Sequence, residues 1–305
     1  HTQPLDTKTL DADPLNAEAQ DSTIDSQTSN WTCEEIPEPP TIPSSPLPAM
    51  EILGKSETVP EGDFTDDYLY DGTGSFKIGT RREWGSAVVF FGQDLGTPGQ
   101  NGTNVIDSND TGREVQIALY DSQRIHQGCA WNASCGSNPA LTCPPKISYL
   151  GWNPVQGGNK CNLGSGVEEQ DTQDGILIAE VIPLHWNPDW EAQDCAQTAC
   201  NDPQKKLLKS DVRYVQRIRF VKKHIVEIHM RVENLSGIDH APYIQEFPTL
   251  YASYGSNGTP NLHKLLDSEG NHIPIDQDAN DGFYKKEFQS SNAWVTLQND
   301  DHNYG

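Results

Sequence analysis

Two adjacent runs, residues 212–220 and 225–234, constrain the fold most. If they form a strand pair, a single turn position gives compatible cross-strand pairs on both faces of the pair. A turn at residues 222–224 sets the register. On one face it pairs apolar residues: Phe220 with Val226, Ile218 with Ile228 and Tyr214 with Val232. On the other face it pairs charged and polar residues: Arg219 with Glu227, Arg217 with His229 and Arg213 with Glu233. We therefore predict an antiparallel hairpin whose charged face is turned to solvent or, as the alternative, lines a cleft.

Other strand-like segments follow from about residue 74 onward. Short apolar or alternating runs at residues 86–93, 115–120 and 175–182 are bounded by Gly, Pro, Asn and Asp. Residues 265–275 have the pattern of a second hairpin, and residues 293–298 that of a strand. No segment shows a helical period. The sequence predicts an all-β fold, a large antiparallel β-sandwich with long loops.

Composition limits the partners of this chain. Its 305 residues suffice for one large β domain, although hydrophobic residues make up only 34%. The net charge of −23 disfavours nucleic acid and anionic membrane surfaces as partners. No apolar run reaches the roughly 18 residues that a transmembrane helix needs.

Residues 1–48 are acidic and end in a proline-rich stretch. They contain too few apolar residues for a core, and the prolines favour extended backbone. We interpret them as an arm or linker that can mediate self-association. Residues 49–305 are then the β-sandwich domain, which we expect to continue beyond Gly305.

The cysteines indicate an oxidising compartment. Six cluster in loop-like sequence, where Cys129 with Cys135, Cys143 with Cys161 and Cys195 with Cys200 flank successive loops. We interpret them as disulfide staples of a secreted or extracellular-surface protein, because no CxxC pair supports zinc. Cys33 is left unassigned. Six Asn-x-Ser/Thr sequons predict a glycoprotein if the host glycosylates: Asn30, Asn101, Asn109, Asn132, Asn234 and Asn257.

Residues 240–251 carry the candidate proton-transfer groups His240, Tyr243 and Glu246. In an extended strand, residues at even separation share a face, so His240 and Glu246 are expected to point the same way. A histidine or tyrosine with a carboxylate can epimerise a sugar carbon, abstract a proton α to a uronate or, with a second carboxylate, hydrolyse a glycoside. The alternative is structural: His240 bonds to a loop and Glu246 pairs with an arginine.

Two further segments have the composition of sugar-binding sites. Alternation along residues 115–120 puts Gln116 and Tyr120 on one face, preceded by Arg113, which we add to the catalytic candidates. Alternatively, Arg113 pairs with a nearby aspartate and Tyr120 packs. In residues 151–158, Trp152 offers an apolar plate for a sugar ring, and Asn153 and Gln156 offer hydrogen-bond partners for hydroxyls. A core role for Trp152 is the competing interpretation.

No cofactor or metal is predicted. Residues 276–282 resemble a calcium loop, but the glycine falls one position late and no downstream glutamate follows at the required distance, so calcium is kept only as an alternative. Serine-hydrolase, nucleotide-binding and zinc-protease motifs are absent from the sequence.

The hairpin, the following residues 232–240 and then a glutamate-bearing strand resemble the galactose-mutarotase-like super-sandwich of carbohydrate-active proteins. This fold occurs in aldose epimerases and in domains of polysaccharide lyases and glycosidases. The resemblance implies a super-sandwich in which His240 and Glu246 match acid and base positions on the concave sheet. The chain departs from it in its cysteine-rich loops and in lacking a clear second catalytic histidine, for which His126 or His185 could serve.

Together these patterns predict a secreted carbohydrate-active protein that acts on a polysaccharide or oligosaccharide by proton transfer, as a lyase, epimerase or hydrolase. The alternative is a non-catalytic extracellular protein that binds glycans or serves in assembly.

Overall fold

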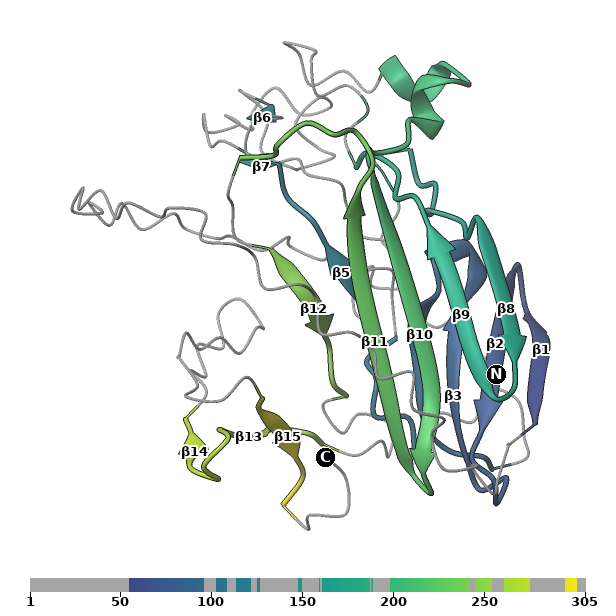
Figure 1. Ribbon diagram of the computed structural model, residues 1–305, viewed down its shortest axis with the longest axis vertical. Coiled ribbons are helices and arrows are strands. Elements are labelled where there is room, and N and C mark those ends of the chain that lie inside the picture. The colour runs from purple at the N-terminus through teal and green to yellow at the C-terminus, as the bar shows by residue number, and fades with distance from the viewer. Residues whose placement is uncertain are drawn as a thin grey trace, which may run out of the picture. The chain divides into compact units, whose positions relative to one another are not determined.

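A computed structural model describes residues 55–95, 103–108, 114–121, 125–126, 148–149, 159, 161–186, 188, 198–241, 245–253, 261–274 and 294–300. The chain divides into two units, and all of these residues belong to the unit formed by residues 51–275 and 287–305. Its strands pair antiparallel throughout (Figure 1). No helix in the described ranges has the length and apolar character needed to cross a membrane.

The larger sheet has six strands in the order β1-β2-β3-β4-β5-β12. Their bounds are β1 Ser56–Glu61, β2 Phe64–Tyr70, β3 Phe76–Arg81, β4 Ala87–Gln93, β5 Val115–Ala118 and β12 Glu246–Leu250. The first five follow each other as neighbours, and β12 returns from much later in the chain to pair with β5. This return brings the predicted site segment 240–251 beside the predicted site strand 115–120.

The second sheet has four strands in the order β11-β10-β9-β8. Their bounds are β8 Glu169–Gln173, β9 Ile176–Val181, β10 Val212–Lys222 and β11 Ile225–Asn234. The predicted hairpin is confirmed: β10 and β11 pair in the expected register, with a single irregularity between Phe220 and Lys222. His224, in the turn, has φ 62°, a left-handed conformation in which few residues other than glycine occur.

Smaller elements complete the described chain. The hairpin expected at residues 265–275 is confirmed by β13 Lys264–Leu266 and β14 His272–Ile273, and β15 Thr296–Gln298 lies in the strand expected at 293–298. The short strands β6 Ile125–His126 and β7 Ser148–Tyr149 pair with each other. The described residues also include the 3-10 turns η1 Arg82–Trp84, η3 Thr198–Asn201 and η4 Lys205–Leu207.

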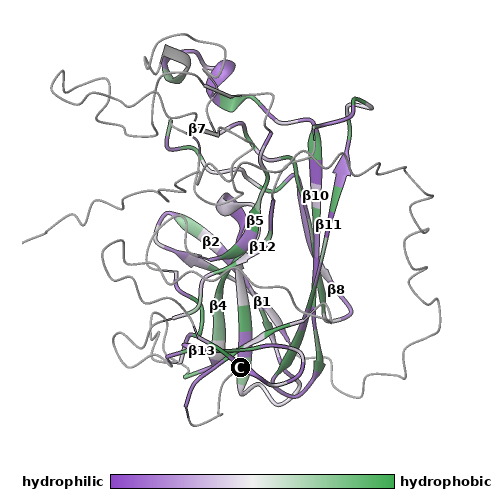
Figure 2. Ribbon diagram, turned by 90° about the vertical axis from the view of Figure 1, so that its left-hand side faces the viewer, coloured by the Kyte–Doolittle hydropathy of each residue, from purple (hydrophilic) through white to green (hydrophobic). Residues whose placement is uncertain are grey.

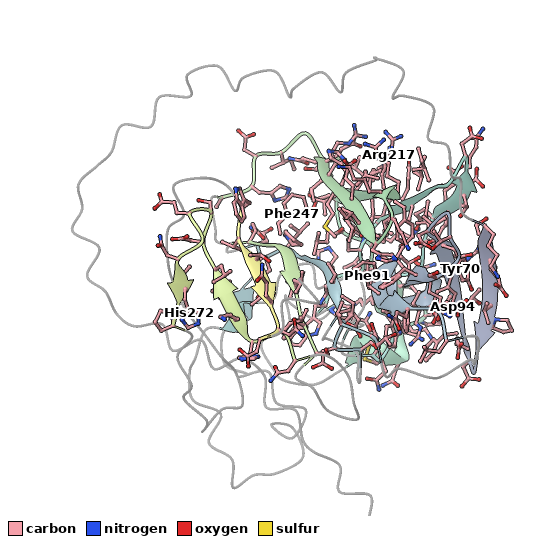
Figure 3. The ribbon with its side chains drawn as sticks, turned by 90° about the horizontal axis from the view of Figure 1, so that it is seen from below. Tyr70, Phe91, Asp94, Arg217, Phe247 and His272 are labelled. Carbon is pink, nitrogen blue, oxygen red and sulfur yellow. A yellow bond between two sulfur atoms is a disulfide. The ribbon has the colours of Figure 1, made fainter. Side chains whose placement is uncertain are left out.

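The two large sheets pack face to face, which confirms the predicted all-β sandwich. Hydrophobic and hydrophilic residues alternate along β10 and β11 (Figure 2), so each strand has one inward face. Phe91 packs on the core, and Arg217 points outward from the other sheet (Figure 3). The core draws on both sheets: Leu69, Ile78, Val88, Val115, Ile117 and Leu119 from one, and Leu177, Ala179, Val181, Val212, Tyr214, Ile218 and Phe220 from the other.

One buried polar contact joins the two sheets. The side-chain amide of Gln216, fully buried in β10, donates to the backbone carbonyl of Ser86 at 2.6 Å, just before β4. The hydroxyl of Tyr214 donates to the carbonyl oxygen of the same Gln216 side chain. Because both groups are buried, these hydrogen bonds avoid the cost of unsatisfied polar atoms and fix how the sheets align.

The strands begin earlier than the sequence predicted. We expected strand structure from about residue 74, but β1 starts at Ser56 and β2 at Phe64. Strand β2 contains two adjacent acidic residues, Asp66 and Asp67. Both are buried because Arg81 and Arg82 each bind one of them through two hydrogen bonds.

Candidate functional site

The return of β12 to β5 joins two of the predicted site residues. Glu246 pairs with Ala118 across the two strands, and the Tyr120 hydroxyl donates to the Glu246 carboxylate at 2.9 Å. The other carboxylate oxygen accepts from the Thr249 hydroxyl at 2.6 Å. The two hydrogen-bonded side chains of Tyr120 and Glu246 are thus brought together from positions 126 residues apart.

Gln245 holds the backbone of Tyr120 in place. Its side-chain oxygen accepts from the Tyr120 N–H at 2.6 Å, and its side-chain amide donates to the Tyr120 carbonyl at 2.8 Å. These two bonds lie just beyond the last β5–β12 pair, Ala118 with Glu246, and tie the two chain segments together there. They fix the backbone position of Tyr120 beside Glu246.

Gln116 lies on the same face of β5 as Tyr120, as its alternation predicts, and sits opposite Thr249. Residues Val115, Ile117 and Leu119 point the other way, into the core. Gln116 is only 3% exposed. Its role in sugar binding stays a prediction. Because the side chain is buried, only a ligand group that inserts between the neighbouring side chains could contact it.

His240 lies between two aspartates. Its Nδ1 is 3.6 Å from Asp121, which directly follows Tyr120, and its Nε2 is 3.5 Å from Asp211, which directly precedes β10. Asp121 is buried, and the other two side chains are each about one-fifth exposed. Histidine exchanges protons near neutral pH, and a carboxylate beside each ring nitrogen restricts how the ring can turn.

One expectation about His240 is wrong. We expected His240 and Glu246 to share one face of a continuous strand, but β12 begins only at Glu246, and His240 lies in the segment that follows β11. The interactions with Asp121 and Asp211 hold His240 there instead. What relates the two residues is the end of β5, because Tyr120 contacts Glu246 and the next residue, Asp121, contacts His240.

Asp121 and Asp211 were missed from the sequence. Asp121 could have been noticed as the carboxylate next to Tyr120, but no local pattern connects Asp211 with His240. Several predicted site residues lie outside the described residues: Arg113, Tyr243, Trp152, Asn153 and Gln156. So do residues 1–48 and the calcium-loop candidate at 276–282. Of the two alternative histidines, His185 is buried and bonded through its backbone to Leu208, and the side chain of His126 is not described.

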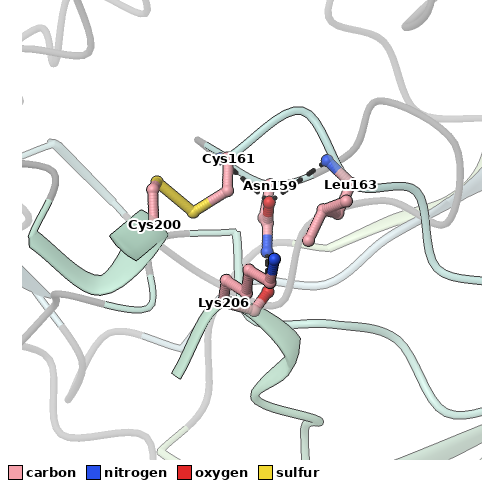
Figure 4. Close-up of a disulfide and its surroundings, with 5 residues drawn as sticks. All are labelled: Asn159, Cys161, Leu163, Cys200 and Lys206. Atoms are coloured by element: carbon pink, nitrogen blue, oxygen red, sulfur yellow. Dashed lines mark hydrogen bonds between the residues drawn. A yellow bond between two sulfur atoms is a disulfide. The ribbon is translucent and has the colours of Figure 1, made fainter. Parts of the chain in front are cut away.

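Two cysteine pairings suggested by nearness in sequence are wrong. Cys161 forms a disulfide with Cys200, and not with Cys143 as its position beside the Trp152 loop suggested; Cys200 is correspondingly not bonded to Cys195 (Figure 4). Asn159 builds the local turn that presents Cys161: its side-chain oxygen accepts from the N–H of Cys161 at 2.9 Å, and its amide donates to the carbonyl of Lys206 at 2.6 Å. The partner of Cys161 is therefore the cysteine that the fold brings close in space, and not the one that flanks the same loop in the sequence. The other cysteines lie outside the described residues: Cys33, Cys129, Cys135, Cys143 and Cys195.

A polar hollow of about 200 Å³ lies between β1 and β8, which are the end strands of the two large sheets opposite β12 and β11. At its wall, Asp67 accepts hydrogen bonds from Arg82, Thr58 and Gln170. Neither His240 nor Glu246 lines it. Within the described ranges, no group of three or more His, Cys, Asp or Glu side chains is placed to hold a metal ion.

No family model, curated protein or solved structure matches the chain. The resemblance to the galactose-mutarotase-like super-sandwich therefore stays a prediction, and the site has to be interpreted from its own geometry.

Proposed function

We propose that this is a secreted carbohydrate-active protein that transfers protons at a sugar carbon or a glycosidic bond, with Tyr120, Glu246 and His240 as its proton-transfer groups. The observation that carries the proposal is the hydrogen bond between Tyr120 and Glu246, which forms just after the end of β5, where the next residue, Asp121, contacts His240. Clusters of proton-exchanging side chains from separate segments are typical of acid–base sites.

The contacts suggest a role for each group. The carboxylate of Glu246 accepts a hydrogen bond from the Tyr120 hydroxyl, so it can take up the hydroxyl proton when the phenol oxygen exchanges a proton with the substrate. Gln245 keeps that oxygen in place through the backbone of Tyr120. Asp121 and Asp211 act as positioning residues for His240. Trp152, Asn153 and Gln156 remain the proposed contacts to the sugar rings.

Secretion is part of this proposal. The disulfide Cys161–Cys200 supports it, because disulfides persist mainly in oxidising compartments. Among the sequons, Asn234 at the end of β11 is exposed, as a glycan acceptor must be.

A second candidate function is a non-catalytic extracellular glycan-binding or assembly protein. The observation that favours it is that both oxygens of Glu246 already accept hydrogen bonds: one from Thr249 within β12, and one from Tyr120, which links β12 to the residues that follow β5. A carboxylate engaged in this way can serve purely to hold two strands together.

A glycan panel separates the two functions. Purified protein is incubated with neutral and uronate-containing polysaccharides, and the products are followed by reducing ends, by the absorbance of unsaturated uronates and by NMR of sugar configuration. A lyase yields unsaturated ends, a hydrolase yields reducing ends without absorbance, and an epimerase changes only the NMR spectrum. Binding without any turnover would favour the second candidate. Neither binding nor turnover on any glycan would contradict the first candidate and would leave only the assembly role of the second.

A further inference from the structure

Strand β11 is a long strand with one neighbour. It spans Ile225–Asn234 and stands at the end of its sheet, where it pairs with β10 among the strands that the structure describes (Figure 1). Its register is regular from Val226 to Asn234, and it contains no proline. A strand of this kind presents N–H and C=O groups on its outer side that can pair with another strand.

The inner face of β11 continues the core. Val226, Ile228, Met230 and Val232 are half-buried and pack against the core clusters. Their burial is incomplete because, within the described residues, no further strand lies beside β11 on the side away from β10. An added strand with apolar residues at the same positions would extend the core and bury them further.

The outer-facing residues of β11 are arranged so that the strand complements itself. We propose that β11 pairs antiparallel with β11 of a second copy of this chain, about a two-fold axis at His229. In that register Glu227 of each copy faces Arg231 of the other, and the two histidines meet at the axis. On the inner face, Val226 faces Val232 and Ile228 faces Met230, which are apolar pairs throughout.

Neighbouring registers fit less well. Only even shifts keep the apolar faces on the same side, because a one-residue slip would turn them over. A shift that centres the axis on Met230 places Glu227 opposite Glu233 in both halves, and like charges directly opposite are destabilising. A shift that centres it on Ile228 leaves Arg231 opposite Ile225 and shortens the paired stretch. Of these three registers, only the axis at His229 pairs Glu227 with Arg231; it leaves Glu233 opposite Ile225 and puts no two glutamates or arginines opposite each other.

The charges that would meet are accessible in one copy. The side chains of Glu227 and Arg231 are 49% and 59% exposed. Each already has one partner within the chain: Glu227 has Arg219, and Arg231 has Glu233. Pairing of two copies would link these into a row of alternating charges, which is worth more than isolated surface pairs.

The test uses charge reversal in the full chain. Sedimentation velocity over a range of concentrations should show the wild-type chain passing from monomer to dimer. Glu227→Arg alone and Arg231→Glu alone should each lower the association constant by about tenfold or more, because each creates two like-charge contacts per dimer. Circular dichroism of each variant establishes that it has folded.

Mixing the two variants gives the decisive result. A heterodimer of one Glu227→Arg chain with one Arg231→Glu chain has opposite charges at both contacts, so the mixture should regain the wild-type association constant. The control is Glu169→Lys, exposed on β8 at the opposite end of the sheet, which should associate as the wild type does. A wild-type chain that stays monomeric, a dimer insensitive to both reversals, or a mixture that does not recover would overturn the proposal. The insensitive dimer would point to the residue 1–48 arm instead.

Discussion

At the scale of single residues, the chain buries several carboxylates despite its net charge of −23, and three of them, Asp66, Asp67 and Asp71, accept hydrogen bonds from defined donors. Asp66 and Asp67 each bind an arginine side chain through two hydrogen bonds. Asp71 organises the turn from β2 to β3 by accepting from Thr73 and from the N–H groups of Ser75 and Phe76. Buried carboxylates are tolerated only when they are satisfied in this way.

Asp71 should make stability depend on acid pH. Burial alone would raise its pKa, but the hydrogen bonds from Phe76, Thr73 and Ser75 and the nearby His224 outweigh burial and lower it below its ordinary value. A lowered pKa in the folded state contributes stability above the unfolded pKa of about 4, and this is lost as the pH falls through the folded value. Urea unfolding at several pH values should show the wild type losing up to about 1 kcal/mol more between neutral pH and pH 3 than Asp71→Asn does.

Asp63→Asn, in the exposed turn between β1 and β2, is the matched control and should follow the wild-type pH dependence. If Asp71→Asn loses as much stability on acidification as the wild type, the assignment of the acid sensitivity to this turn is wrong.

At the scale of elements, the parts predicted from the sequence are those whose partners lie close in the chain. The β10–β11 register could be predicted because both faces of the hairpin are patterned and only one turn satisfies both. The Tyr120–Glu246 contact could be predicted only as two separate candidates, since nothing in either segment indicates that β12 returns to β5. The Cys161–Cys200 bond and the contacts of His240 depend on loops that converge in space, so no local pattern indicates them.

The loop that carries Cys161 packs closely against η1, and its glycines should reveal this. A methyl group built on Gly164 would overlap the carbonyl oxygen of Glu83, whereas one built on Gly166 meets nothing within 4 Å. Thermal or urea unfolding should therefore show Gly164→Ala destabilised by about 1–3 kcal/mol, because the contact atom belongs to the backbone and cannot move aside easily. Gly166→Ala should stay close to the wild type. Equal stability of the two variants would mean that the loop does not rest on η1.

At the scale of the whole described unit, two kinds of long-range link hold the sandwich and its loops together. The hydrogen bond from Gln216 to Ser86 aligns the sheets from within the core. The disulfide from Cys161 to Cys200 joins the loop before β8 to η3, across a sequence separation of 39 residues. The first acts in the folded state, whereas the second also restricts the unfolded chain.

Removing the disulfide tests its pairing and its contribution. Peptide mapping without reduction should recover Cys161 linked to Cys200. The Cys161→Ser, Cys200→Ser double variant should lose about 4 kcal/mol of unfolding free energy, the value that chain entropy gives for a loop of about this length. Recovery of Cys161 linked to Cys143 would restore the pairing first expected from the sequence and contradict the loop arrangement.

The proposed chemistry rests on Glu246, so the most direct measurement compares turnover and glycan binding of the wild type with those of Glu246→Gln. Glutamine keeps the size and one hydrogen-bond acceptor but removes the charge and the proton-accepting oxygen. On a glycan that the wild type converts, we predict that turnover falls by about 10²-fold or more while the dissociation constant changes little. Glu169→Gln, exposed on β8, should keep full turnover. If Glu246→Gln retains full activity, or loses its fold instead of its turnover, Glu246 is a structural tie between β5 and β12 and the acid–base site does not exist.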